Sequence, residues 1–218
     1  MKLQAFVQTV PGRERALAQT LRSLRQSDLS EKPIVRVHPP GRTVRQFFLS
    51  VLREMTESSA ELVVRFEDDV TVSAHIESNV LSWPELHDSR FGAGWLFAAA
   101  GSRTIIDYAY QRPGVSRWHR SWVHCSCAVL FWRRDLPGLI GDIERAVARE
   151  HPEYGGQDKL IGQAVLEAGK QICVHVPSLV EHELGHGSSM GHPQIGLYDS
   201  ARDGFKRSWL RGQRFSAR

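Results

Sequence analysis

The first third of this 218-residue chain alternates three times between a short run typical of a strand and a segment with helical periodicity. In the helical segments apolar residues recur every three or four positions, whereas the runs between them are too short for a helix. The expected strands are residues 2–8, 33–38 and 61–66, and the helices that follow end near residue 25 or span residues 44–55 and 74–81. Repeated strand-helix-strand units predict an α/β fold with a mostly parallel central sheet flanked by helices.

The rest of the chain continues this alternation less regularly. Further strands are expected at residues 94–99, 123–132 and 171–176, and helices at residues 136–147 and 155–168. Between two of these strands, residues 101–122 show no period and carry Tyr and Trp among several Arg side chains, which indicates a functional excursion. Without a repeat or linker, we expect residues 1–201 to form a single domain and residues 202–218 a basic tail.

The excess of basic charge lies in that tail. Lys and Arg number 28 and Asp and Glu 24, which gives a net charge of +4. Residues 202–218 hold six basic side chains and only Asp203 as an acid, so the tail carries +5 and the remainder −1. Such a tail can bind phosphate in a nucleotide, in nucleic acid or at an anionic membrane surface, or it can simply be solvated.

Composition excludes several other classes of protein. With 41% hydrophobic and 24% charged residues, the chain is not mainly disordered. Its apolar runs are far shorter than the roughly 20 residues of a membrane-spanning helix, and its N-terminus lacks a signal-peptide pattern. We therefore expect a cytoplasmic protein, in the host cytoplasm if phage-encoded, with no membrane span and with its three cysteines reduced. Nothing in the sequence points to a protein partner.

Three consecutive acids, Glu67, Asp68 and Asp69, follow directly after the third expected strand. Ligands of open α/β sheets bind beyond the carboxyl ends of the strands, where this triplet would stand. Adjacent carboxylates repel one another, and carboxylate oxygens suit Mg²⁺ or Mn²⁺, either of which can bridge a diphosphate. The triplet therefore predicts a metal-nucleotide site, and the alternative is a solvated turn.

A second cluster, formed by His182, Glu183 and His186, matches the HExxH pattern of zinc peptidases, with His192 in the place of a third ligand. That pattern needs a well-formed helix, yet Pro177 stands shortly before it and glycine and serine are frequent within it. A zinc metallopeptidase is thus one alternative function, and a histidine-rich loop without a catalytic role is another.

Three segments together resemble a glycosyltransferase of the GT-A type. Residues 61–70 (ELVVRFEDDV) resemble the strand that ends in a DxD or EDD motif, and residues 155–162 (GGQDKLIG) resemble the helix start that carries a catalytic acid. Residues 175–182 (HVPSLVEH) are similar to a Pro-Ser-Leu-Val-x-His stretch near the C-terminus of such families. The resemblance implies a single Rossmann-like GT-A domain that uses a nucleotide-sugar donor, with a UDP-sugar the leading choice, and a divalent metal, Mn²⁺ or Mg²⁺.

The resemblance also implies roles for the acids and for His182. Asp69 would be a direct metal ligand, and His182 a ligand of the metal or of the diphosphate. Glu67 and Asp68 would contact the water shell of the metal or the ribose of the donor. Each of these residues has a structural alternative; His182, for example, could be a hydrogen-bonded core residue.

Three further candidates come from the loop after the first strand and from the start of the last helix. Thr9 and Arg13 lie in the expected nucleotide-binding loop, where Arg13 could pair with phosphate or base, or lie on a helix surface. Asp158 would be the catalytic base that removes the acceptor proton, and the configuration of the sugar would then invert. The alternative role of Asp158 is a helix N-cap.

The acceptor is left open by the sequence. Residues 103–122 are the natural acceptor region because aromatic faces stack on sugars or bases and arginines bind phosphate. The short chain and its basic tail make a hydroxymethylated base in DNA, as in phage-type DNA modification, one hypothesis for the acceptor, and a saccharide is the competing one. A non-catalytic module that binds nucleotide-sugar or nucleic acid is the alternative from a different functional class.

Overall fold

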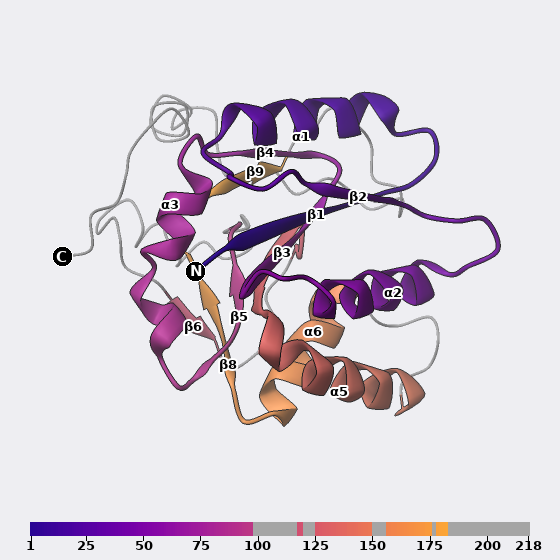
Figure 1. Cartoon of the computed structure of the whole chain (residues 1–218). Coiled ribbons are helices and arrows are strands. Elements are labelled where there is room, and N and C mark those ends of the chain that lie inside the picture. The colour runs from indigo at the N-terminus through magenta and orange to yellow at the C-terminus, as the bar shows by residue number, and fades with distance from the viewer. Residues whose placement is uncertain (98–116, 120–124, 150–155, 176–177, 183–218) are drawn as a thin grey trace, which may run out of the picture.

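A computed structural model describes residues 1–97, 117–119, 125–149, 156–175 and 178–182 (Figure 1). These residues form a central sheet with helices on both faces. None of the helices in these ranges is long and apolar enough to cross a membrane.

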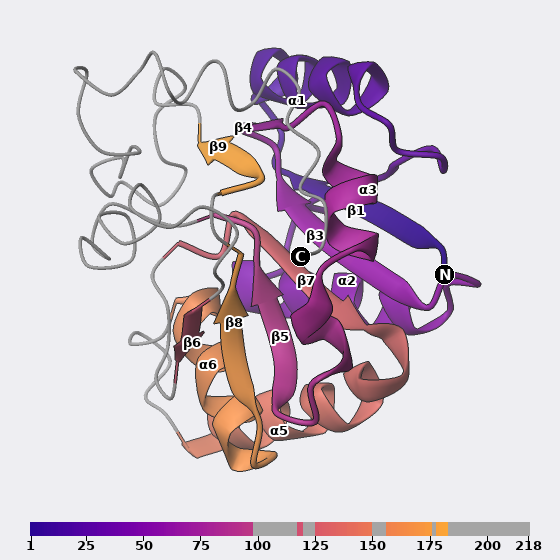
Figure 2. The same cartoon turned by 90° about the vertical axis from the view of Figure 1, so that its left-hand side faces the viewer.

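The central sheet has seven strands. They are β1 (Leu3–Thr9), β2 (Ile34–Val37), β3 (Leu62–Glu67), β5 (Phe91–Trp95), β6 (Arg117–His119), β7 (Ala128–Trp132) and β8 (Gln171–Val174). Their spatial order is β2-β1-β3-β7-β5-β8-β6, and Figure 2 shows the part of this order from β1 to β6. Five strands run in the same direction, and β7 and β6 oppose them. The predicted α/β class with a mostly parallel sheet is therefore confirmed.

A second, two-stranded sheet lies beside the first. It pairs β4 (Val70–Val72) with β9 (Val180–His182) in antiparallel register, with Val70 opposite His182. Neither strand is predicted by the sequence, because three residues are too few to show an alternation of apolar and polar side chains.

The helices pack on the two faces of the large sheet. They are α1 (Glu14–Gln26), α2 (Val44–Thr56), α3 (Ile76–Leu81), α5 (Leu136–Arg149) and α6 (Gln157–Glu167), with short 3₁₀ turns at Pro84–His87 and Arg133–Asp135. Successive residues of β3 alternate between two cores: Val63 contributes to the first, Val64 and Phe66 to the second. This period of two is what a strand buried on both faces requires.

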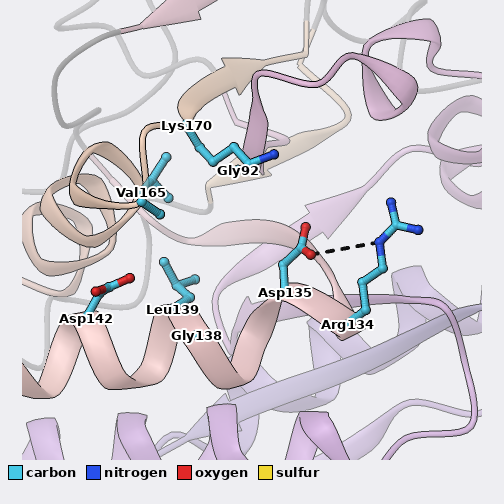
Figure 3. A pocket seen from close by; sticks show the side chains of 9 residues that line it. Gly92, Arg134, Asp135, Gly138, Leu139, Asp142, Val165 and Lys170 are labelled. Carbon is cyan, nitrogen blue, oxygen red and sulfur yellow. Dashed lines mark ion pairs between the residues drawn. The ribbon is translucent and has the colours of Figure 1, made fainter.

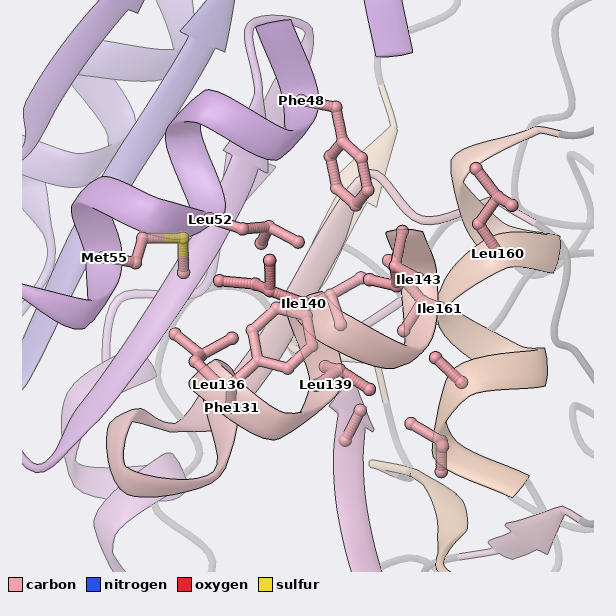
Figure 4. Packing of buried hydrophobic residues seen from close by; sticks show 14 of the residues in the cluster. Phe48, Leu52, Met55, Phe131, Leu136, Leu139, Ile140, Ile143, Leu160 and Ile161 are labelled. Carbon is pink, nitrogen blue, oxygen red and sulfur yellow. The ribbon is translucent and has the colours of Figure 1, made fainter. Parts of the chain in front are cut away.

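The first core lies between the sheet and helices α2, α5 and α6. Figure 4 shows Phe48, Leu52 and Met55 of α2 facing Ile140 of α5, with Ile161 of α6 beyond. The second core includes residues of α1, α3, β4 and β9 on the opposite face. Apolar burial on both faces fixes the sheet as a rigid platform for the loops at its edges.

Helix α2 begins at the position that the sequence predicts, and its start shows why. The Thr43 hydroxyl accepts a hydrogen bond from the Gln46 amide at 3.1 Å, and the Gln46 side chain accepts one from the Thr43 amide at 2.9 Å. This capping box satisfies two amides that a helix start otherwise leaves without a partner.

Several expected strand boundaries are wrong. Strand β5 begins at Phe91 instead of residue 94, and β7 begins at Ala128 instead of residue 123. Cys125 and Cys127, expected within that strand, therefore precede it. Both are free thiols, as is Cys173. Strand β6 lies within the stretch for which the sequence predicts no element.

Candidate functional site

The candidate site lies where β1 and β3 end at the same edge of the sheet. The two strands are parallel, and Gln8 near the end of β1 is paired with Glu67 at the end of β3. Asp68 and Asp69 form the turn that leads from β3 into β4. All three predicted acids thus stand at the carboxyl edge of the sheet, where α/β folds bind ligands.

Thr20 of α1 holds the acidic turn of Asp68 and Asp69 through hydrogen bonds to its backbone. Its hydroxyl lies 2.7 and 2.8 Å from the carbonyl oxygens of Asp68 and Val70 and accepts a hydrogen bond from the Val70 amide at 3.0 Å. Thr20 is fully buried. A buried hydroxyl that contacts three backbone groups fixes the turn on helix α1.

Asp68 is engaged with the predicted nucleotide-binding loop. Its Oδ2 accepts a short hydrogen bond from the Thr9 hydroxyl, and its Oδ1 accepts one from Arg13 Nε at 2.8 Å. Burial raises the pKa of Asp68 more than Thr9 and Arg13 lower it. Both carboxylate oxygens of Asp68 are therefore used within the protein.

Asp69 faces the side chains of Arg13 and His182. Arg13 Nη2 lies 2.5 Å from its Oδ2, and His182 Nε2 lies 3.3 Å from its Oδ1. Burial by itself would raise the pKa of Asp69, but His182 and Arg13 outweigh it, so that the pKa is lowered. Of the three acids, only Asp69 is held more strongly in its charged form than a free carboxylate.

Strand β9 brings His182 to the acids. Because Val70 is opposite His182 in the β4-β9 pair, the histidine lies next to the acidic turn although it is far away in sequence. Its side chain is 12% exposed and also contacts the Phe97 ring, with the ring centres 6.1 Å apart. A β-strand, not a helix, thus holds His182.

Glu67, Asp69 and His182 form a group that fits a divalent metal. Each offers one ligand atom, and these atoms lie within 4.8 Å of one another. Asp69 Oδ1 is buried, and its 3.3 Å contact with His182 Nε2 does not have hydrogen-bond geometry, so this oxygen is suited to a closer cationic partner. Two carboxylates and an imidazole are a donor set that Mn²⁺ and, less readily, Mg²⁺ accept.

The Glu67 carboxylate differs from that of Asp69. Burial among protein atoms raises its pKa; Asp69 and Asp68 raise it further, whereas Arg65 and His182 oppose the rise. The side chain is 37% exposed, so solvent moderates this effect. A divalent cation would favour the charged form of Glu67, which is the form that binds metal.

Arg65 supports the site from inside the sheet and is not among the residues predicted from the sequence. Its side chain is fully buried; it donates to Gln8 Oε1 at 3.0 Å and to the Ser126 carbonyl and hydroxyl, and it lies 3.7 Å from Glu67 Oε1. Burial lowers the pKa of Arg65, against the nearby charge of Glu67. The one signal in the sequence is an arginine inside an otherwise apolar strand, which requires a buried partner.

Residues 125–127 connect Arg65 to Asp158. The Glu67 amide donates to the Cys127 carbonyl at 2.9 Å, and the Cys125 amide donates to Asp158 Oδ2 at 3.3 Å. Asp158, at the start of α6, is thereby linked to Glu67 through residues 125–127. The N-cap of α6 is Gly156, which makes no side-chain cap, so the N-cap role considered for Asp158 is wrong.

The peptidase alternative does not agree with the fold. His182 is the last residue of β9, whereas the HExxH pattern needs its first histidine on a helix. Glu183, His186 and His192 lie outside the described residues. The basic tail at residues 202–218 also lies outside the described residues, as does the predicted acceptor region apart from residues 117–119.

A separate cavity of about 290 Å³ lies at the opposite edge of the sheet (Figure 3). It is bounded by Arg134 and Asp135 before α5, by Gly92 at the start of β5 and by Lys170 before β8. Lys170 donates to the Ser89 carbonyl at 2.7 Å, and Arg134 pairs with Asp135 at 3.8 Å. This cavity is remote from the acids because parallel strands place their two ends at opposite edges.

The mostly parallel sheet flanked by helices is that of the GT-A fold of glycosyltransferases, and comparison with solved structures agrees. The chain is similar to the galactosyltransferase LgtC in complex with donor and acceptor sugar analogues, at 12% identity, a TM-score of 0.50 and coverage of 84% of this chain and 87% of that one. It is also similar to the glycosyltransferase GlyE of Streptococcus pneumoniae TIGR4, at 11% identity, a TM-score of 0.50 and coverage of 99% and 66%.

A third solved structure, A197 from STIV, matches at 8% identity and a TM-score of 0.52, with 92% of this chain and 95% of that chain covered. No family model matches the sequence, and no curated protein matches it either. At these identities the likeness establishes the fold. The predicted GT-A fold is therefore confirmed.

Proposed function

We propose that the chain is a glycosyltransferase that depends on a divalent metal and moves a sugar from a nucleotide-sugar donor to an acceptor hydroxyl. The observation that carries this proposal is the convergence of ligand atoms of Glu67, Asp69 and His182 within 4.8 Å at the carboxyl edge of a GT-A fold. A solvated acidic turn would not need a buried histidine delivered by a separate strand.

In this proposal Glu67, Asp69 and His182 hold Mn²⁺ or Mg²⁺. When bound, such an ion supplies positive charge that stabilises the diphosphate leaving group. Asp68 has a different task, because Thr9 and Arg13 occupy its oxygens. It holds the nucleotide-binding loop against the acidic turn, so that the loop and the ligand residues stay in a fixed relation.

Asp158 is the proposed catalytic base. It lies at the start of α6, and one of its carboxylate oxygens, Oδ2, accepts the Cys125 amide. In its charged form Asp158 would accept the proton of the acceptor hydroxyl while that oxygen attacks the anomeric carbon from the face opposite the diphosphate. Attack from that face inverts the configuration of the sugar.

A UDP-sugar is the donor that we propose to test first. The acceptor in the proposal is a hydroxymethylated base in DNA, for which the basic tail at residues 202–218 provides phosphate-binding charge, with a saccharide as the competing acceptor. In the proposal residues 1–201 form one catalytic domain, and the protein is located in the cytoplasm. Affinity for DNA that falls steeply with salt, and falls on deletion of residues 202–218, separates the two acceptors.

The proposed function is tested by thermal stabilisation. Wild type, Asp69→Asn, His182→Ala and the control Asp135→Asn, which alters a carboxylate at the opposite edge, are heated with UDP, GDP or their sugars and with Mn²⁺, Mg²⁺ or a chelator. We expect one nucleotide to raise Tm only with metal in wild type and in the control, and not in the two site variants. Stabilisation without metal, or stabilisation that survives Asp69→Asn, would contradict the proposal.

A further inference from the structure

Two arginines face the three acids, Arg65 at Glu67 and Arg13 at Asp68 and Asp69, and they are held in different ways. Arg65 is fully buried, and Gln8 and Ser126 accept hydrogen bonds from it, so it cannot leave. Arg13 keeps 12% of its side chain exposed, and Asp68 and Asp69 hold its guanidinium. Arg13 is therefore the one of the two that can move without unfolding the sheet.

The guanidinium of Arg13 spans two carboxylates of the turn. Its Nε donates to Asp68 Oδ1 at 2.8 Å, and its Nη2 donates to Asp69 Oδ2 at 2.5 Å. Its backbone is fixed independently, because the Arg13 carbonyl accepts the Leu17 amide at 3.0 Å in the first turn of α1. Rotation of the Arg13 side chain thus leaves this backbone hydrogen bond in place.

Asp69 also belongs to the group with Glu67 and His182, so the arginine and a divalent cation use the same carboxylate. Two cations that share one carboxylate repel each other, more strongly where both are partly withdrawn from water. A divalent ion also removes the excess negative charge that attracts the guanidinium. Binding of the ion therefore weakens the hold of Asp69 on Arg13.

Once a divalent ion is bound, a diphosphate is a more favourable partner for Arg13 than Asp69 is. The planar guanidinium matches phosphate oxygens in a two-pronged arrangement, as it matches carboxylates. Arg13 stands on the first nucleotide-facing loop, within reach of the carboxylates that would hold the ion. Released from Asp69, its side chain can turn to phosphate oxygens beside the metal site without any backbone change.

We propose that Arg13 is an exchangeable counterion of the site: it pairs with Asp68 and Asp69 when the metal is absent, and it transfers to the donor diphosphate when the metal binds. This inference rests on the proposed function. It goes further by assigning one residue opposite effects on the two ligands. Removing Arg13 should favour the metal and disfavour the nucleotide.

The test measures binding, without turnover. Mn²⁺ alone is titrated by calorimetry into wild type, Arg13→Gln and the control Arg15→Gln, which removes the same charge from an exposed position in the same turn of α1. UDP is then titrated in the presence of saturating Mn²⁺. We expect Arg13→Gln to bind Mn²⁺ about tenfold more tightly and UDP about tenfold more weakly, with Arg15→Gln close to wild type.

Arg13→Lys provides the second variant, since it keeps the charge but loses the two-pronged geometry. It should bind Mn²⁺ as wild type does and UDP more weakly. Weaker Mn²⁺ binding by Arg13→Gln, or unchanged UDP binding by both variants, would overturn the exchange while the proposed function stands. Failure of wild type to bind either ligand would instead overturn the proposed function and the exchange together.

Discussion

The backbone amide of Cys125 donates a hydrogen bond to Oδ2 of Asp158, and Cys125 adopts a φ of 62° to do so. Residues other than glycine rarely occupy this left-handed region, and the conformation costs about 1–3 kcal/mol. The neighbouring contacts of Ser126 with Arg65 and of Cys127 with Glu67 hold the segment in place. The segment thus couples the position of Asp158 to that of the acids.

Asp158→Asn should separate binding from chemistry. Asparagine can still accept the Cys125 amide through its side-chain carbonyl, so the start of α6 keeps its geometry while the proton acceptor is lost. We expect metal-dependent stabilisation by nucleotide to remain and sugar transfer to fall by about 10²–10⁴. Transfer is followed with the donor that thermal stabilisation identifies, and Asp135→Asn is the control. A variant that keeps more than a tenth of the wild-type rate would exclude Asp158 as the base.

Arg65→Met should strongly destabilise the protein. The substitution leaves the Ser126 carbonyl and Gln8 without a donor and removes the charge that faces Glu67, and we expect a loss of about 3–5 kcal/mol in the free energy of unfolding. Arg133→Met is the matched control, because Arg133 donates to the Ala60 carbonyl at 2.9 Å at the opposite edge. Its loss should be near 1 kcal/mol. Chemical denaturation measures both, and equal losses would contradict the special role of Arg65.

The pair of Asp88 and Arg90 predicts a dependence on acid pH. Hydrogen bonds from Arg90 lower the pKa of Asp88 from 3.8 to about 2. Because the folded-state pKa is the lower one, the contribution of this pair to stability is present above pH 3.8 and is lost as the pH falls towards 2. Arg90→Gln should raise the pKa of Asp88 back towards 3.8, and NMR of the carboxyl group measures this change. A titration near pH 2 in that variant would show that Arg90 is not the cause.

The same variant offers a second, optical measurement. The Arg90 guanidinium stacks over the Trp118 ring of β6, with 4.5 Å to the ring centre. Loss of this contact should change Trp118 fluorescence, and unchanged emission would contradict the stacking.

Two glycine-to-alanine substitutions should have opposite effects. A Cβ at Gly94 in β5 would lie 2.7 Å from the Trp83 ring, whereas a Cβ at Gly138 in α5 would meet no atom within 4 Å. We expect Gly94→Ala to destabilise by about 1–3 kcal/mol because the core is overpacked. Gly138→Ala should stabilise by about 0.5–1 kcal/mol through helix propensity. Thermal unfolding compares the two, and a destabilised Gly138→Ala would contradict the open space at that position.

The sequence predicts the elements with strong periodicity and the edge of the sheet at which the acids stand. Helix α2 is an example, since six of its residues are buried and Thr43 and Gln46 form its capping box. The resemblance places the acids, His182 and Asp158 at one site, and the structure brings Glu67, Asp69 and His182 together. Their roles as metal ligands, nucleotide contacts and base stay predictions.

What the sequence could not predict depends on contacts between distant segments. Arg65 finds its partners in Gln8 and Ser126, and neither has a local pattern that marks it. Asp68 and Asp69 also differ because of distant residues: their contacts come from Thr9, Arg13 and His182, and the triplet itself does not reveal them. Tertiary contacts, and not local propensity, thus decide which acid is available to a ligand.

The pairing of β4 with β9 also has a consequence for folding. His182 reaches Asp69 only after these two short strands, which come from distant parts of the chain, have found each other. Closing so long a loop for three residue pairs costs entropy that the pairing alone recovers poorly. We therefore expect the histidine to dock after the large sheet has formed, and a divalent ion to speed or stabilise that last step. Capacity to bind the ion would then report complete folding of the chain.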